Sequence, residues 1–215
     1  MNSQTERLTL SGPAGSLEAL LDAPSASEAL GTAVIAHPHP LFGGTMDNKV
    51  VQTVARAFVQ SGWRALRFNF RGVGASQGSY DEGRGELDDM LAVVAGGVPG
   101  DRLALAGFSF GAFVAVAAAA RLFAQRRIDH LVLVGAAASR FDLLPVPPTL
   151  KSCTLLVHGE QDDTVPLSAV VDWARPQNLP VTVFPGCGHF FHGQLPLLRQ
   201  VVAGGIAAHA VTAGT

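Results

Sequence analysis

Residues 103–121 read L-A-L-A-G-F-S-F-G-A-F-V-A-V-A-A-A-A-R, and this stretch decides the fold. A short apolar run, typical of a buried strand, ends at Gly107, and an alanine-rich run typical of a helix begins almost at once. Only a very sharp turn fits between them, and Ser109 lies alone at that turn. A Cβ at Gly107 or Gly111 would collide with the neighbouring strand or helix, so both positions need glycine. The pattern G-x-S-x-G therefore predicts a serine held in a strained conformation at a strand-to-helix turn.

This turn would place the hydroxyl of Ser109 at the carboxyl end of a strand and at the N-terminus of the next helix. Free N–H groups and the helix dipole favour negative charge there, which suits a tetrahedral oxyanion. A helix-capping serine in a glycine-rich turn has the same pattern, so the motif by itself leaves both interpretations open. The flanking strand and helix favour the nucleophile.

Strand-like and helix-like patterns alternate along the whole chain. The expected strands are residues 8–10, 16–21, 32–37, 64–70, 103–107, 129–134, 154–158 and 181–184. The expected helices are residues 46–60, 80–95, 167–174 and 195–209, besides the one after Ser109. The alternation predicts an α/β fold with a mostly parallel sheet of about eight strands flanked by helices, an N-terminal hairpin at one sheet edge, and ligands at the carboxyl ends of the strands. The short connection over residues 135–151 leaves no room for a large cap domain.

Composition narrows the class of protein. The chain has 215 residues, of which 48% are hydrophobic and 15% charged, and we expect one α/β domain over residues 1–215. A net charge of -2 argues against nucleic acid or an anionic membrane as a partner. Residues 112–120 form the longest apolar stretch and are too few to span a bilayer, and the N-terminus lacks the pattern of a secretory signal, so we expect a cytoplasmic protein. We expect it to be a monomer or a homodimer. Cys153 and Cys187 form no C-x-x-C motif and predict buried thiols, although a bridge between them is geometrically conceivable.

Two further motifs supply partners for a nucleophilic serine. Residues 158–166 read H-G-E-Q-D-D-T-V-P and residues 184–193 read F-P-G-C-G-H-F-F-H-G, each directly after an expected strand. They bring Asp162 or Asp163 and then His189 to the same sheet edge as Ser109, in the order Ser, Asp, His. Paired aspartates are often helix caps and a histidine in a glycine-rich turn is often a solvated loop residue. The joint occurrence of three pieces in this order favours a catalytic triad.

The chain resembles the α/β-hydrolases, specifically the small, lidless bacterial serine hydrolases related to dienelactone hydrolase. Residues 32–195 carry the resemblance, through these motifs and through A-H-P-H-P-L-F-G-G-T-M-D-N-K-V and N-F-R-G-V-G-A-S-Q-G. It implies that Asp162 is the acid, that Asp163 is a cap or loop residue, and that His189 is the base, with His192 outside the pattern. Dienelactone hydrolases use a cysteine nucleophile where this chain has Ser109, so their substrate does not carry over.

The oxyanion of such a reaction needs two N–H donors. One is expected from Phe110, directly after the nucleophile, and the other from the loop that follows strand 32–37. Prolines at positions 38 and 40 have no N–H, and register with related hydrolases implies His39, with Leu41 as the alternative. A metal site at His37 and His39 is disfavoured because no third ligand lies at suitable spacing, and no cofactor is expected.

The sequence thus predicts a carboxylesterase-type serine hydrolase that forms an acyl-enzyme with a small-molecule ester, preferably one with a small or short acyl group. Apolar residues near the motifs are candidates either for the acyl site or for the core: Phe42, Phe108, Phe110, Leu143 and Leu144. A thioesterase or a small peptidase would use the same triad. A hydrolase-like fold serving as a non-catalytic binding module is the alternative of another class.

Overall fold

The computed structural model describes residues 5–25, 28–100 and 102–212, with side chains as far as residue 209. The strands are β1 Thr5–Gly12, β2 Gly15–Asp22, β3 Thr32–Ala36, β4 Arg64–Phe68, β5 Leu103–Phe108, β6 Ile128–Val134, β7 Thr154–Gly159 and β8 Val181–Phe184. The helices are α1 Lys49–Gln60, α2 Arg84–Gly97, α3 Phe110–Leu122, α4 Leu167–Ala174 and α5 Leu195–Thr212. Short 3-10 helices span Pro40–Phe42, Pro148–Cys153 and Arg175–Gln177.

The strands form one sheet of eight in the order β1-β2-β4-β3-β5-β6-β7-β8. The hairpin β1–β2 joins β4 in antiparallel fashion at one edge, and every pair from β4 to β8 is parallel. This confirms the predicted fold class, including the hairpin at the sheet edge. In the centre of the sheet Ala36 of β3 pairs with Gly107 of β5, so the loops after these strands leave the sheet side by side.

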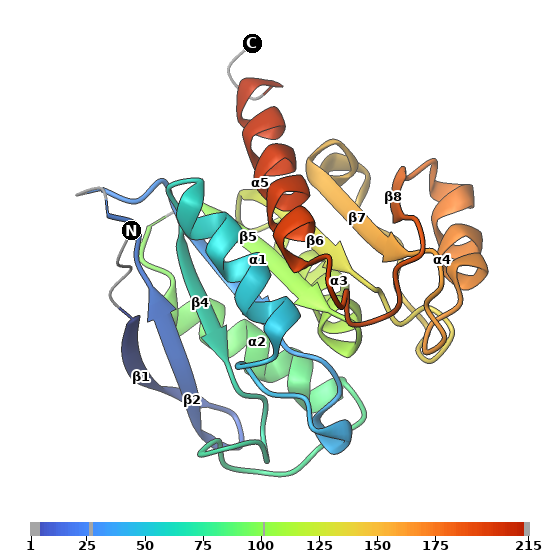
Figure 1. Ribbon diagram of the computed structural model, residues 1–215. Helices are drawn as coiled ribbons and strands as arrows, with labels where there is room; N and C mark the ends of the chain where they lie inside the picture. The colour runs from blue at the N-terminus through green and yellow to red at the C-terminus, as the bar shows by residue number, and fades with distance from the viewer. Residues whose placement is uncertain (1–4, 26–27, 101, 213–215) are drawn as a thin grey trace.

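Helices cover both faces of the sheet (Figure 1). Helices α1 and α5 pack on one face, where their apolar side chains meet Phe108, Phe184 and Phe191. Side chains of α2, α3 and α4 pack on the other face, in a core that contains Phe68, Phe70 and many alanine and valine residues of α3. The alanine-rich sequence of α3 follows from this position, because a helix buried against a sheet and a second helix needs small side chains.

Two helices begin later than the sequence pattern predicts, because capping side chains set their first residue. The Asn48 carboxamide oxygen accepts a hydrogen bond from Val50 N–H at 2.9 Å, so α1 begins at Lys49 and not at residue 46. Glu86 accepts hydrogen bonds from the backbone N–H groups of Gly83 and Asp81, at 2.7 and 2.9 Å, so α2 begins at Arg84 and not at residue 80.

The connection between β6 and β7 contains one short 3-10 helix and forms no cap, in agreement with the prediction. Cys153 and Cys187 are free thiols and not a bridge; Cys187 is buried as predicted, whereas Cys153 is only partly buried. Within the described part of the chain, no helix is long and apolar enough to cross a membrane. Residues 1–4 of the N-terminal segment, and residues 26 and 27 between β2 and β3, lie outside the described residues. A single domain over residues 1–215 stays a prediction.

Candidate active site

Ser109 occupies the turn between β5 and α3, with backbone angles φ 57° and ψ -116°. This conformation is rare for a residue with a side chain, and the surrounding contacts maintain it. Ser109 N–H donates to the carbonyl of Val134 on β6 at 2.9 Å. A Cβ on Gly107 would lie 2.1 Å from the Gly111 carbonyl oxygen, and one on Gly111 would lie 2.3 Å from the Ala36 carbonyl oxygen. The expected collisions with helix and strand are confirmed, and the serine projects from the carboxyl edge of the sheet.

Ser109, His189 and Asp162 form a chain of hydrogen bonds at this edge. His189 Nε2 lies 3.0 Å from Ser109 Oγ, and His189 Nδ1 lies 2.6 Å from Asp162 Oδ2. All three residues are buried, so little water competes for these contacts. With Nδ1–H donating to the carboxylate, Nε2 is free to accept the serine proton. The arrangement can therefore remove a proton from the hydroxyl as it attacks an electrophile.

The Asp162 carboxylate is held on both oxygens. Its Oδ1 accepts hydrogen bonds from the backbone N–H groups of Thr164 and Val165, at 3.0 and 2.7 Å. Burial raises the pKa of Asp162, but the hydrogen bonds from His189 and Val165 outweigh it and leave the pKa below its ordinary value. Asp163 is exposed, and among the described residues its carboxylate accepts only the hydroxyl of Thr164, at 3.4 Å. Of the two aspartates, the structure brings Asp162 to the histidine.

The second histidine of the last motif takes no part in this chain. His192 is exposed, and its ring packs on Phe190 with 5.9 Å between ring centroids. Phe190 in turn lies edge-on to His189, with 5.2 Å between centroids, and it is 45% exposed. Phe190 thus shields one side of the His189 ring from solvent.

The backbone N–H groups of Phe110, directly after Ser109, and of His39 have no acceptor among the described residues. The alternative donor, Leu41 N–H, is already committed to His39 Nδ1 at 3.2 Å. The His39 ring packs against Phe110, with 5.1 Å between centroids, which places its loop against the nucleophile turn. Of the two candidate donors, Leu41 N–H is thus paired and His39 N–H is available to an acceptor.

His37 fixes the orientation of the His39 amide. The His37 Nδ1–H group donates to the Pro38 carbonyl at 2.6 Å, and Nε2 accepts from Phe70 N–H at 3.1 Å. Because the Pro38 carbonyl and the His39 N–H belong to the same planar peptide group, holding the first orients the second. Burial lowers the pKa of His37 to about 4, so the ring stays neutral and can keep both roles. A metal ion at His37 would have to displace one of these two contacts.

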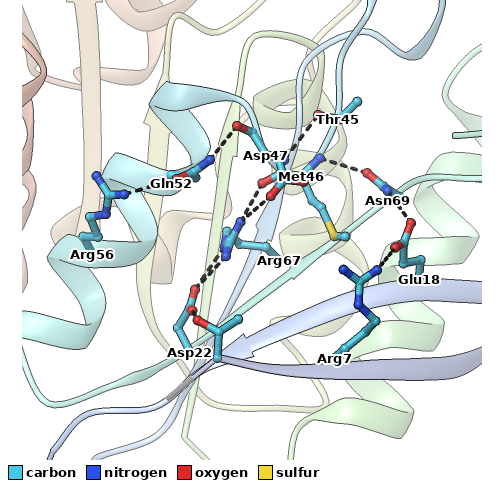
Figure 2. Close-up of polar contacts among 11 residues, drawn as sticks. Arg7, Glu18, Asp22, Thr45, Met46, Asp47, Gln52, Arg56, Arg67 and Asn69 are labelled. Carbon is cyan, nitrogen blue, oxygen red and sulfur yellow. Dashed lines mark hydrogen bonds and ion pairs between the residues drawn. The ribbon is translucent and has the colours of Figure 1, made fainter. Parts of the chain in front are cut away.

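Side chains of β4 and the residue after it anchor the other end of the same loop (Figure 2). Asn69 accepts a hydrogen bond from Met46 N–H, and Arg67 donates to the Met46 carbonyl, both at 2.9 Å. Arg67 is itself held by Asp22 at 3.0 Å and by Asp47 at 3.2 Å. Hydrogen bonds thus hold loop 37–48 against the sheet near both of its ends.

The sequence motifs indicate no role for Arg67 or Asn69, and for His37 they suggest only a disfavoured metal site. A usable signal was present in residues 64–70, R-A-L-R-F-N-F, where Arg67 and Asn69 interrupt an otherwise apolar strand. Charged and amide side chains in such a strand must find partners, and the nearest free backbone groups belong to the adjacent loop.

The apolar residues suggested for an acyl site divide into two groups. Phe108, Phe110 and Leu143 are buried and belong to the core. Phe42 is 85% exposed and Leu144 is 48% exposed, so these two stay available to a substrate. An open cavity of about 480 Å³ lies between α1, α5 and the hairpin β1–β2, and a second of about 390 Å³ lies between α1 and α5; neither is lined by Ser109, Asp162 or His189.

Comparison with known proteins places this chain in a family. The model of the alpha/beta hydrolase fold matches residues 42–152, just over half of the chain. The chain belongs to the α/β-hydrolase family. A lidless α/β serine hydrolase of Xanthomonas campestris, XC6422, is 39% identical, superposes with a TM-score of 0.84, and the match covers 97% of this chain and 96% of that one.

Two further proteins match most of the chain. An α/β serine hydrolase homologue of Coxiella burnetii is 38% identical with a TM-score of 0.80, over 94% of this chain and 97% of that one. A protein of Rickettsia prowazekii (strain Madrid E), RP471, is 30% identical over 202 residues, which is 86% of this chain and 82% of its own length. The predicted membership among lidless α/β-hydrolases is confirmed, and the chain is a hydrolase of this class.

Proposed function

We propose that this α/β-hydrolase cleaves carboxylic esters with small or short acyl groups through an acyl-enzyme on Ser109. The hydrogen-bond chain from Ser109 Oγ to His189 and on to Asp162, at 3.0 and 2.6 Å, carries the proposal. A serine hydroxyl attacks a carbonyl only when a base removes its proton, and His189 is the base within reach.

The proposed reaction has two halves. His189 Nε2 takes the proton of Ser109 while Oγ bonds to the ester carbonyl carbon, and the N–H groups of Phe110 and His39 stabilise the oxyanion. His189 then gives the proton to the leaving alkoxide oxygen as the ester bond breaks, which leaves an acyl group on Ser109. Water repeats the attack with His189 again as base, and the carboxylic acid and free Ser109 result. Asp162 holds the His189 tautomer and stabilises the imidazolium that forms twice per cycle.

The preference for small acyl groups has a physical basis in the surroundings of Ser109. Phe108 and Phe110, the apolar residues on either side of it, are used in the core. The connection between β6 and β7 forms no cap over the turn. The candidate apolar side chains that stay exposed, Phe42 and Leu144, then have no cap over them that would enclose a long acyl chain.

Labelling with a fluorophosphonate probe, followed by a panel of p-nitrophenyl esters of increasing acyl length, tests the proposal. We expect one label on Ser109, the highest kcat/KM for short acyl groups, and a loss of at least about a thousandfold in Ser109→Ala. Ser168→Ala is the matched control, because Ser168 is an exposed residue on α4. Equal ester hydrolysis by Ser109→Ala would refute the proposed role of Ser109.

Thioester and anilide substrates in the same panel separate the alternatives that share the triad. A higher kcat/KM for a thioester than for the matching ester would indicate that the protein is a thioesterase and not an esterase. A higher kcat/KM for anilides would indicate a peptidase. Absence of labelling and of all three activities would favour a binding module.

A further inference from the structure

A third buried histidine lies against the proposed Ser109–His189–Asp162 relay. His158 is on β7, four residues before Asp162, and its side chain is fully buried. Its Nε2 lies 2.8 Å from the Val165 carbonyl oxygen and 3.4 Å from Asp162 Oδ2. Its Nδ1 is buried and has no hydrogen-bond partner among the described residues.

These contacts determine the tautomer of His158. A carbonyl oxygen only accepts hydrogen bonds, so the nitrogen 2.8 Å from Val165 O carries the proton. Nδ1 then presents a bare lone pair, which is less costly to bury unpaired than a second N–H of a charged ring. Burial lowers the pKa of His158 against the opposing effects of Val165 and Asp162. His158 is therefore a neutral donor that does not compete with His189 for the charge of the carboxylate.

The turn that carries Asp162 is clamped from both sides by Val165. The Val165 carbonyl accepts from His158, while Val165 N–H donates to Asp162 Oδ1 at 2.7 Å. The other oxygen, Oδ2, lies between His189 Nδ1 at 2.6 Å and His158 Nε2 at 3.4 Å. The positive end of the His158 N–H dipole is thus beside the oxygen that must face His189. Rotation of the carboxylate away from His189 would forfeit these contacts together.

We infer that His158 is a positioning residue of the proposed relay: its Nε2–H holds the 162–165 turn and keeps Asp162 Oδ2 directed at His189. This inference rests on the proposed function, because a positioning role has meaning only if the relay operates. Partners one step removed from reacting groups are typically worth about ten- to a hundredfold in activity. Such partners act on turnover more than on substrate binding.

Three substitutions of His158 separate positioning from simple core packing. His158→Gln keeps an N–H near the place of Nε2, His158→Asn has a shorter amide that does not reach it, and His158→Leu has no donor. We expect kcat per labelled active site to fall about tenfold or more in the Leu and Asn variants, with KM within about twofold. The Gln variant is expected to recover most of the loss. If the Leu variant does not fold, the Gln and Asn pair decides, because both carry a neutral amide.

The low-field proton resonance of the His189 Nδ1–H group provides a readout that core packing does not control. We expect it to move upfield or broaden in His158→Asn and His158→Leu and to return in His158→Gln, because the bond to Asp162 depends on the position of the carboxylate. His130→Leu is the control, since His130 is equally buried but lies at the far end of neighbouring β6. Loss of thermal stability in the Leu and Asn variants, with unchanged kcat per active site and an unmoved resonance, would overturn the inference.

The same experiment distinguishes failure of the inference from failure of the proposed function. Wild-type protein that neither takes the fluorophosphonate label nor hydrolyses an ester, thioester or anilide contradicts the proposed function. If the wild-type protein takes the label and hydrolyses a substrate, but kcat per active site and the His189 resonance do not change with the residue at position 158, only the role of His158 is contradicted.

Discussion

Buried polar side chains differ in their hydrogen bonding between the two edges of the parallel sheet. At the carboxyl edge His37, His189 and Asp162 are buried, and every one of their side-chain nitrogen or oxygen atoms has a hydrogen-bond partner. Five buried side-chain atoms among the described residues have none: one, His158 Nδ1, is at the carboxyl edge, and the other four belong to residues near the amino edge, Thr32, Arg102, Asp129 and His130.

The register explains why these four residues lie near one another. Thr32 begins β3 and pairs with Leu103, which pairs with Ile128 in turn. The register shifts between Leu103 and Ala104, so Asp129 has no direct partner across the ladder. The bulge leaves Asp129 to the guanidinium groups of Arg102 and Arg127, at 3.3 and 2.9 Å.

The difference between the two edges indicates where this fold can fix the position of buried polar side chains. Loops and helix N-termini follow the carboxyl ends of parallel strands, and they supply the backbone amides that satisfy buried carboxylates and imidazoles. The amino edge receives the ends of crossovers and offers fewer such amides. Backbone amides therefore fix the buried polar groups at the carboxyl edge. At the amino edge, buried polar atoms without a hydrogen-bond partner mainly lower the stability of the fold.

The largest expected effect comes from uncharging Asp162. Asp162→Asn leaves His189 Nδ1 without a carboxylate, so we expect kcat/KM for a short ester to fall by about a thousandfold or more. Asp163→Asn, one residue away and exposed, is the matched control and should stay within about twofold of wild type. The reverse result in a steady-state assay would move the acid to Asp163.

The next effect concerns the oxyanion loop. His37→Leu removes the donor to the Pro38 carbonyl and the acceptor for Phe70 N–H, so the peptide that carries His39 N–H loses its fixed orientation. Loss of one oxyanion donor typically costs about a hundredfold or more, and we expect a fall in kcat/KM of about a hundredfold, mainly in kcat.

His130→Leu, at the other edge, tests whether that fall in activity comes from the position of His37. It removes a buried histidine of the same type and should leave kcat/KM per folded molecule unchanged. Equal losses of kcat/KM in the two variants would contradict the contrast between the edges.

The sequence predicted the edge on which Ser109, Asp162 and His189 meet because each follows an apolar run that ends at the same side of a parallel sheet. It predicted α4 and β8 to the residue, since apolar periodicity and flanking prolines mark their limits. It did not predict the start of α1 or α2, because Asn48 and Glu86 act through contacts that periodicity does not reveal.

The parts of the site that the sequence left open depend on side chains meeting across the fold. The sequence leaves both His39 and Leu41 as candidates for the oxyanion donor. The structure separates them, because Leu41 N–H already donates to His39 Nδ1. Arg67 and Asn69 act on Met46 from more than twenty residues away, and His158 acts through the carbonyl of Val165. No motif spacing encodes such contacts, since they depend on strand register and on how a loop crosses the sheet edge.

The third prediction concerns acid stability. Burial lowers the pKa of His130 to about 4, with His209 and Arg102 acting in the same direction and Asp129 opposing them. A histidine whose pKa is lower in the folded than in the unfolded state contributes stability above its unfolded pKa, and this contribution is lost as pH falls from about 6.5 toward 4.

At pH 5 the linkage for His130 amounts to about 2 kcal/mol of unfolding free energy relative to pH 7. We therefore expect the fall in unfolding free energy between pH 7 and pH 5, measured by urea titration, to be about 2 kcal/mol smaller in His130→Leu than in wild type. The packing cost of the substitution cancels because it is the same at both pH values. His37 and His158 keep their own acid sensitivity in this variant, so a residual slope is expected. An unchanged slope would show that His130 is not held neutral in the folded state.

The smallest expected effect is at Arg102, the most exposed member of the amino-edge group. Its guanidinium lies 5.1 Å from the centroid of the Trp63 ring and 3.3 Å from Asp129, but Arg127 also contacts Asp129, at 2.9 Å. Because the carboxylate keeps one partner, we expect Arg102→Leu to lower the unfolding free energy by no more than about 1 kcal/mol. A double-mutant cycle with Arg127→Leu should then show a penalty larger than the sum of the two, since only the pair leaves Asp129 buried without a cation. If the losses of unfolding free energy in the two single variants simply add in the double variant, Asp129 is stabilised by groups other than these two arginines. The buried polar groups at the amino edge would then have more partners than their contacts indicate.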